Sequence, residues 1–178
     1  FGKLSEALAR RARLEAEQLG LDALVFAYPA LPFTLPEVSR QEDGQRQIFQ
    51  ARAEVLHGQR DQLEGQKEQT GHQIEGLQGQ LTARKDQLSL IEAELANMRQ
   101  LVTQGLARRA QMTDLQRTES ELRGQIAGLE ADLARLGNAV QEAELKTLQA
   151  ERAFKEEVVT ELRAVTAQIE ELTLEILT

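Results

Sequence analysis

Apolar residues recur at heptad spacing through a long central part of the chain. If Phe49 is taken as the first core position, one set of sites follows at seven-residue steps, and a second set, beginning at Ala53, falls between them. The first set is Phe49, Leu56, Leu63, Thr70, Leu77, Arg84, Ile91 and Met98, and the second is Ala53, Arg60, Lys67, Ile74, Leu81, Leu88, Leu95 and Val102. Because most of these residues are apolar and the register never slips, the pattern predicts a long coiled-coil helix.

A second seam, that is, a second row of core positions at heptad spacing, follows after residue 108. It starts with Leu115, Glu119, Leu122, Ile126, Leu129, Leu133, Leu136 and Val140, and continues less regularly through Ala143, Thr147, Ala150 and Phe154. Steps of four residues then lead through Val158 and Leu162, before Val165, Ile169, Leu172 and Ile176 restore alternating threes and fours. Such an irregularity locally unwinds a left-handed supercoil, and the seam as a whole predicts a second long helix.

Prolines and one glycine mark the breaks between these helices. All 3 prolines lie at positions 29, 32 and 36, where each removes a backbone donor and disfavours helix before it. Before them, apolar residues at four-residue steps predict a short amphipathic helix over residues 3 to 19, with Ser5 as a possible cap and Gly20 as its stop. Residues 21 to 33 then form either a strand-like segment or an apolar plug. Gly105 lies where the first seam ends and predicts a tight turn.

Two heptad helices joined by a short connection are typical of antiparallel neighbours. We therefore expect an all-α fold, a long antiparallel two-helix coiled-coil hairpin with a short additional N-terminal helix. The expected organisation is a short helix plus Pro-rich linker at the hairpin base (residues 1–36) and a hairpin (37–178) with arms of about 37–100 and 108–176 and a tip of about 101–107. An arm of this size would span on the order of 90 Å, and the N-terminal helix would cover the excess of the second arm.

Composition agrees with a thin helical core. Ala, Glu, Lys, Leu and Arg make up just over half of the 178 residues, and only 3% are aromatic. The net charge of −8, with no basic stripe, argues against a nucleic-acid partner. No apolar stretch is long enough for a membrane span, so we expect no membrane contact by this part of the protein. Because the chain opens with Phe1 and shows no signal-peptide pattern, we expect it to be a processed chain or an excised fragment.

No residue pattern indicates catalysis, a metal site or a cofactor. Cysteine is absent, and His57 and His72 are about 22 Å apart along one helix, too far to share a metal ion. The interior glycines have two interpretations. They either mark a tolerant solvent-facing surface, or, as in the Gly124-x-x-x-Gly128 pair, they allow a neighbouring helix to approach closely.

Arg108 and Arg109 lie just beyond the predicted turn, at the start of a helix, where the macrodipole disfavours cations. They are candidate partner contacts at an exposed tip, or an ordinary solvent-facing pair.

Four blocks of the sequence resemble HlyD-type periplasmic adaptor proteins, also called membrane fusion proteins, of type I secretion systems. They are the runs Ala9–Phe26, which resembles the family's ARLxAExxGxxxIxFP segment, Gln87–Leu95, Leu101–Arg108 and Phe154–Arg163. They occur in family order, and the adaptors of protease and lipase exporters are the most similar.

The resemblance implies the α-helical hairpin domain of an adaptor in the periplasm, anchored to the inner membrane by a segment absent here. An inner-membrane ABC transporter, a TolC-like outer-membrane channel and further copies of the same chain are the implied partners. The implied tip contacts are Arg99, Leu101, Val102, Gly105, Leu106, Ala107 and Arg108. Ala107 stands where the family commonly has Ser, which also removes a natural N-cap of the second arm.

A different class of function also fits the heptads. A generic structural or scaffolding coiled coil could dimerise in parallel, with Gly105 as a flexible skip. Enzyme activity is not expected in either case.

Overall fold

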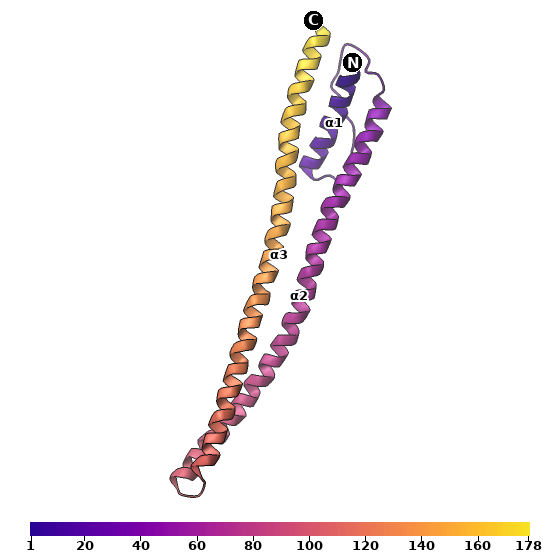
Figure 1. Cartoon of the computed structure of the whole chain (residues 1–178). Helices are drawn as coiled ribbons and strands as arrows, with labels where there is room; N and C mark the ends of the chain where they lie inside the picture. Colours follow the sequence, from indigo (N-terminus) through magenta and orange to yellow (C-terminus); the bar gives the residue numbers. More distant parts are fainter. The chain divides into compact units, whose positions relative to one another are not determined.

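The computed structural model describes all residues from 1 to 178 and contains helices but no strand. Helix α1 spans Gly2–Leu19, α2 spans Val38–Thr103 and α3 spans Arg109–Leu177 (Figure 1). The all-α fold class is therefore confirmed. The chain divides into a three-helix unit, Phe1–Leu63 with Leu145–Thr178, and a hairpin unit, Glu64–Glu144.

Helix α1 ends as the sequence indicates but begins differently. Gly20 adopts a left-handed conformation with φ of 66°, and the amide groups of Gly20 and Leu21 donate to the carbonyls of Glu17 and Ala16. This is a Schellman motif, in which glycine avoids the steric cost of a positive φ. Ser5 is not a cap. It lies within the helix and is buried, and its hydroxyl donates to the Phe1 carbonyl at 3.3 Å.

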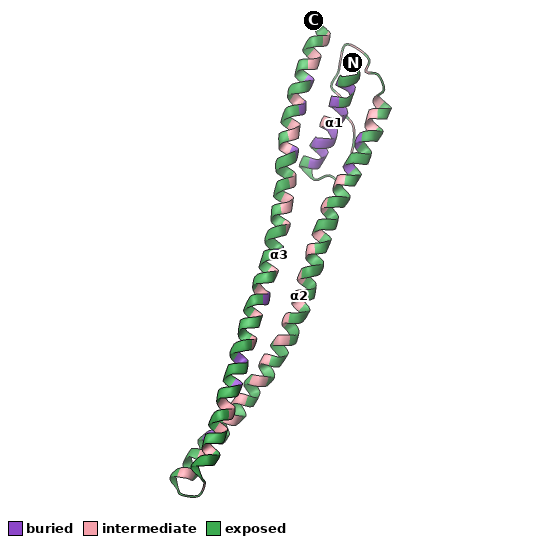
Figure 2. Ribbon diagram, in the orientation of Figure 1, coloured by how far each residue is buried: buried purple, intermediate pink, exposed green.

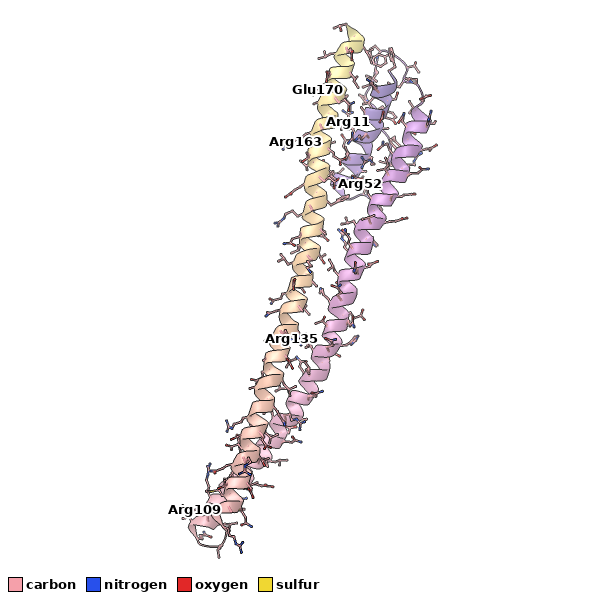
Figure 3. The ribbon with its side chains drawn as sticks, viewed as in Figure 1. Arg11, Arg52, Arg109, Arg135, Arg163 and Glu170 are labelled. Carbon is pink, nitrogen blue, oxygen red and sulfur yellow. The ribbon has the colours of Figure 1, made fainter.

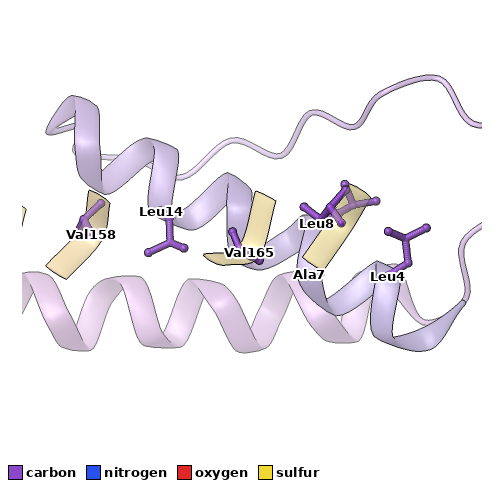
Figure 4. Close-up of a cluster of buried hydrophobic side chains, with 7 residues drawn as sticks. Leu4, Ala7, Leu8, Leu14, Val158 and Val165 are labelled. Atoms are coloured by element: carbon purple, nitrogen blue, oxygen red, sulfur yellow. The ribbon is translucent and has the colours of Figure 1, made fainter. Parts of the chain in front are cut away.

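The core of the three-helix unit lies between α1 and α3. Leu4, Ala7, Leu8 and Leu14 of α1 pack with Val158, Val165 and Ile169 of α3, and all are buried (Figure 4). The four-residue steps that interrupt the heptad spacing of the second seam reach into this same part of α3. The N-terminal helix therefore packs against this part of the second arm. Buried residues lie around much of α1 and not on a single stripe (Figure 2).

A buried ionic network joins all three helices of this unit. The Arg13 guanidinium donates to Gln45 Oε1 at 2.7 Å and to Glu17 Oε1 at 2.8 Å, and lies 3.7 Å from Glu161 Oε2. Arg52 Nε lies 3.0 Å from Glu17 Oε1, and its Nη1 lies 3.7 Å from Glu161 Oε1. Arg13 and Glu17 are almost fully buried, so their charges are compensated by each other and by Arg52 and Glu161.

The order of these contacts gives the helix directions. Arg13 and Glu17 meet Gln45 and Arg52 in the same chain order, so α1 and α2 run in the same direction. In contrast, in the pairs Arg52–Glu157 and Arg60–Glu151 the later residue of α2 meets the earlier residue of α3, so α2 and α3 are antiparallel in this unit.

The segment between α1 and α2 packs on the helices without forming a strand. Phe1 and Phe33 meet edge to face at 5.1 Å between ring centroids, and the Arg46 guanidinium lies 5.0 Å from the centroid of Phe26. The Tyr28 hydroxyl donates to Glu42 Oε1 at 2.7 Å. Burial, together with this hydrogen bond, raises the pKa of Tyr28 far above its ordinary value.

The hairpin unit is an antiparallel pair made by one chain. Ion pairs join its two helices in nested order, Lys67 with Glu144, Lys85 with Glu130, and Glu92 with Arg123. Leu95 of α2 and Leu122, Ile126, Leu136 and Ala143 of α3 are buried between them. A parallel dimer with Gly105 as a skip is therefore not the architecture of this chain.

The predicted seams agree with the observed burial except at one residue. Every second-seam residue named above is buried or half-buried, as is every first-seam residue but Ala53, which is exposed. Ala53 was expected inside because it continued the register. Arg52 takes the inward position instead, because its guanidinium reaches the carboxylates of Glu17 and Glu161.

The interior glycines do not mark a close helix approach within this chain. A Cβ placed at Gly124 or Gly128 would meet no atom within 4 Å, and the same holds at every other glycine. For contacts within the chain, the interpretation of Gly124-x-x-x-Gly128 as a packing motif is therefore wrong, and these residues lie on an open helix surface.

Candidate partner-binding site at the hairpin turn

Helix α2 ends in a second Schellman motif. Gly105 has a φ of 74°, its amide donates to the Val102 carbonyl at 3.1 Å, and the Leu106 amide donates to the Leu101 carbonyl at 2.8 Å. These bonds use two of the carbonyls that a helix end leaves free. The predicted tight turn at Gly105 is confirmed, and the last helical residue of α2 is Thr103.

Helix α3 begins after Arg108, which occupies its N-cap position. The Arg108 amide donates to Gln111 Oε1 at 3.3 Å. This bond is the returning half of a capping box, in which the third helical residue reaches back to the N-cap amide. Ala107 therefore does not occupy the cap position, contrary to the expectation from the resemblance. Gln111 was overlooked, although a Gln three residues after the cap was the signal that could have identified it.

Two leucines expose apolar surface at the turn. Leu106 is 72% exposed and Leu101 is 38% exposed, whereas Val102 and Ala107 are half-buried. The turn backbone is fixed by the hydrogen bonds described above. The Leu106 side chain is consequently presented on a defined scaffold, and a partner could bury it at little conformational cost.

Positive charge gathers at the same place. Between Leu95 and Asp114 the chain has no acidic residue but carries Arg99, Arg108 and Arg109. All three are exposed, and no carboxylate lies within ion-pair distance of them. Figure 3 shows Arg109 at the turn. A chain with a net charge of −8 thus has a locally cationic turn that retains its full capacity for charged hydrogen bonds.

All the predicted tip residues lie in this turn or in the helix ends next to it. Arg99, Leu101 and Val102 are in the last part of α2, and Gly105, Leu106, Ala107 and Arg108 lie in the connection. Thr103 also belongs here, since its hydroxyl donates to the Arg99 carbonyl at 2.8 Å. The arrangement provides exposed leucine and guanidinium groups, which suit a protein surface of mixed apolar and acidic character.

Other parts of the chain show no convergence of reactive groups. A groove of about 460 Å³ in the three-helix unit is lined mainly by apolar residues such as Val55, Leu56 and Phe154. Its charged groups, Arg52 and Glu157, pair with each other at 3.4 Å. No three potential metal ligands lie together, and no helix combines the length and apolar character needed to cross a bilayer.

The fold defines a class of protein, an α-helical hairpin with a third helix packed against its two arms. The family described as "AprE, long alpha-helical hairpin" matches residues 2–178, and the chain belongs to this family. The resemblance noted in the sequence is thereby confirmed.

A solved structure shows the same fold. It is described as the soluble domain of LipC, a membrane fusion protein of a type I secretion system. The two chains are 24% identical with a TM-score of 0.89, and the match covers 97% of this chain and 82% of the other. No curated protein matches the sequence.

Proposed function

We propose that this chain is the hairpin domain of a periplasmic adaptor in a type I protein secretion system. Its hairpin turn contacts a TolC-like outer-membrane channel, while the protein works with an inner-membrane ABC transporter. The chain performs no chemistry in this role. It presents a binding surface and holds other components together.

Family membership over residues 2–178 supports this role, as does the fold shared with LipC, a membrane fusion protein of a type I secretion system. The observation that carries the proposal is the hairpin turn itself. An exposed Leu106 next to three unpaired arginines is an unusual surface on an acidic helical protein, and it needs a partner to gain any stabilising contact. Apolar contact supplies affinity, and the arginines supply orientation and a faster encounter.

The periplasm is the proposed location, with anchorage in the inner membrane by a part of the protein outside these residues. We further propose that several copies stand side by side in the assembly, with their hairpin turns all directed at the channel. Each turn would then contribute a small contact, and the copies together would bind with much greater avidity than one alone.

Protein export measured in cells tests the role of the turn. Leu106→Asp places a charge where apolar contact is proposed, and Arg108→Glu reverses the charge beside it. Each is expected to reduce export at least tenfold, because burying an unpaired carboxylate at an interface costs more than the roughly 1.4 kcal/mol that corresponds to a factor of ten.

Matched controls lie on the same helices away from the turn. Leu90 is 68% exposed on α2, and Arg135 is exposed on α3 (Figure 3). Leu90→Asp and Arg135→Glu change the same side-chain types and are expected to leave export near the wild-type level. Equal export by all four variants, at equal protein levels, would falsify the proposed role of the turn.

A further inference from the structure

The groove of about 460 Å³ between α2 and α3 in the three-helix unit is an apolar surface without a partner in the chain. Its apolar walls are formed by Ala51, Val55 and Leu56 of α2 and by Ala150, Ala153 and Phe154 of α3. Val55 is 63% exposed. An apolar groove that is open to water gains stability when an apolar side chain of a partner fills it.

Helix α3 carries two exposed leucines on the side that faces away from this groove. Leu145 and Leu148 are 53% and 58% exposed, and both belong to the same unit as the groove. They precede Ala150 by five and two residues, which places both about half a turn of the helix away from the groove wall. The unit therefore has an apolar recess on one side and an apolar projection on the opposite side.

The charges beside these two surfaces have opposite signs. Arg152 is exposed and has no ion pair, and it follows Leu148 by one turn of α3. Glu157 lies at the corresponding end of the groove, where it pairs with Arg52 at 3.4 Å while its side chain remains 56% exposed. If two copies point in the same direction and Leu148 of one enters the groove of the other, Arg152 lies towards Glu157.

A second exposed leucine pair lacks this match. Leu174 and Leu177 are 65% and 58% exposed near the end of α3. Glu170 and Glu171 lie one turn before Leu174 and share its face (Figure 3). These carboxylates would repel Glu157 in the groove.

We propose that Leu145 and Leu148 of one copy of this protein insert into the groove of the next copy, with Arg152 paired to Glu157 across the contact. The inference rests on the proposed function, in which several copies stand side by side, and it names the surfaces through which they meet. Each copy gives its leucines to one neighbour and receives those of another, so the contact is head to tail and can close into a ring. The leucines precede the centre of the groove wall by about seven residues, on the order of 10 Å along α3, so neighbouring copies meet at a tilt.

The position of the two surfaces selects a second copy as the occupant. A two-fold pair that joins groove to groove would leave the leucines of both copies in water. A different partner, or a segment of the same protein outside these residues, would also leave them uncovered if it filled the groove. A second copy covers both surfaces with one kind of contact and supplies the cation that Glu157 attracts.

Cross-linking between cysteines identifies the occupant directly, since the chain has no cysteine of its own. The full-length protein, without cysteines elsewhere, is produced in cells with its secretion system as two differently tagged copies. One copy carries Ala153→Cys in the groove and the other carries Leu148→Cys. A short thiol cross-linker is expected to give a product with both tags. Absence of this product, or a product that joins Ala153→Cys to a different protein, overturns the proposal.

Leu174→Cys is the matched control, because Leu174 is exposed on the same helix but lies outside both surfaces. Paired with Ala153→Cys, it is expected to give at least tenfold less two-tag product, because distant cysteines cannot be bridged. Equal yields overturn the proposal. An equal yield from two copies that both carry Ala153→Cys identifies a groove-to-groove contact and overturns it also.

Leu145→Asp tests the apolar contact in the same assay. Added to the Leu148→Cys copy, it is expected to lower the two-tag product at least tenfold, because a carboxylate would have to enter the apolar groove. Its exposed position leaves the fold intact, and Leu174→Asp is expected to leave the product unchanged. Unchanged product in Leu145→Asp overturns the proposal. Leu106→Asp is expected to lower export without changing the product, so a failure of this contact and a failure of the role of the turn can be distinguished.

Discussion

At the scale of single residues, Gly20 and Gly105 are the two glycines with positive φ, at 66° and 74°. Both end a helix in a Schellman motif and are followed by leucine. The other glycines have no such backbone requirement, and no atom lies near the place of a Cβ at any of them. A Gly→Ala change therefore isolates the backbone contribution, free of steric overlap.

Gly105→Ala and Gly79→Ala are expected to change stability in opposite directions. Alanine at position 105 must adopt a left-handed conformation and should destabilise the hairpin by about 1 kcal/mol. Alanine at position 79, inside α2, should stabilise it by about 1 kcal/mol, because glycine is a poor helix former. Urea unfolding followed by circular dichroism measures both changes. A stabilising effect at position 105 would contradict the assigned turn.

Tyr28 is the only tyrosine, and the chain has no tryptophan, so its ionisation can be followed directly by ultraviolet absorbance. Burial and the hydrogen bond to Glu42 raise its pKa. The protonated form is favoured in the folded state, so this contribution to stability is complete below the unfolded pKa of about 10 and is lost as the pH rises through the folded value. The absorbance titration is expected to have its midpoint well above pH 10 in the folded chain. It should return to about 10 in urea.

Tyr28→Phe supplies the matching stability measurement. Wild type and variant are expected to differ by a constant free energy of unfolding below pH 10, and the difference should move in favour of the variant above it. A difference independent of pH would show that folding does not raise the pKa of Tyr28.

At the scale of the elements, α1 is joined to the other two helices by charge as well as by apolar contact. Glu17 accepts a hydrogen bond from Arg13 and lies 3.0 Å from Arg52, and its side chain is 3% exposed. Its second oxygen, Oε2, has no hydrogen-bond partner in the chain. Removing the charge of Glu17 would leave two arginines beside a neutral side chain, with only Glu157 and Glu161 to compensate them.

Glu17→Gln is expected to destabilise the three-helix unit by about 3 kcal/mol, because loss of one partner from a buried ion pair leaves an uncompensated charge. Glu15→Gln is the matched control. Glu15 pairs with Arg11 at 3.7 Å on the surface, and its side chain is 56% exposed, so its loss should cost less than about 0.5 kcal/mol. Thermal unfolding of the two variants measures the difference. Similar values would mean that the buried network is not a source of stability.

At the scale of the whole molecule, the two units differ in how their helices are covered. The three-helix unit has a cluster of fully buried side chains, among them Leu4, Leu14 and Val158. The hairpin unit has only two helices, and most of its seam residues are half-buried. It also contains eight of the 12 glycines.

Helical amides of the hairpin unit are expected to exchange faster than those of the three-helix unit. Local opening needs less free energy where fewer apolar contacts must be broken and where glycine weakens the helix. Mass spectrometry of peptides from residues 64 to 100 and from residues 150 to 175 measures the rates. Equal protection of the two regions would mean that the third helix adds nothing to local stability.

The heptad sequence determined most of the architecture. Leucine, isoleucine and valine at coiled-coil spacing require a long apolar contact along each helix, the prolines interrupt the helix, and Gly105 permits a turn that other residues disfavour. These are local properties of the chain, so the two long helices, the turn and the inward faces could be predicted from residues alone. Arg108 could be chosen as a candidate contact from its position just beyond the turn, whereas the other tip residues were implied by the resemblance to the adaptor family.

Tertiary structure alone decided which charged residues are buried and whether the connection between α1 and α2 pairs as a strand. Arg13 and Glu17 have the spacing of an ordinary surface pair on a helix, and only the packing of α1 between α2 and α3 removes them from water. The heptad register places Ala53 inside and Arg52 outside. The structure reverses this, because the register describes only the contact between the two long helices and α1 is a third neighbour. Residues 23 to 28 have the composition of a strand, but pairing depends on groups distant in the sequence. This chain supplies no partner for their backbone, because all its other backbone hydrogen bonds belong to helices and their ends.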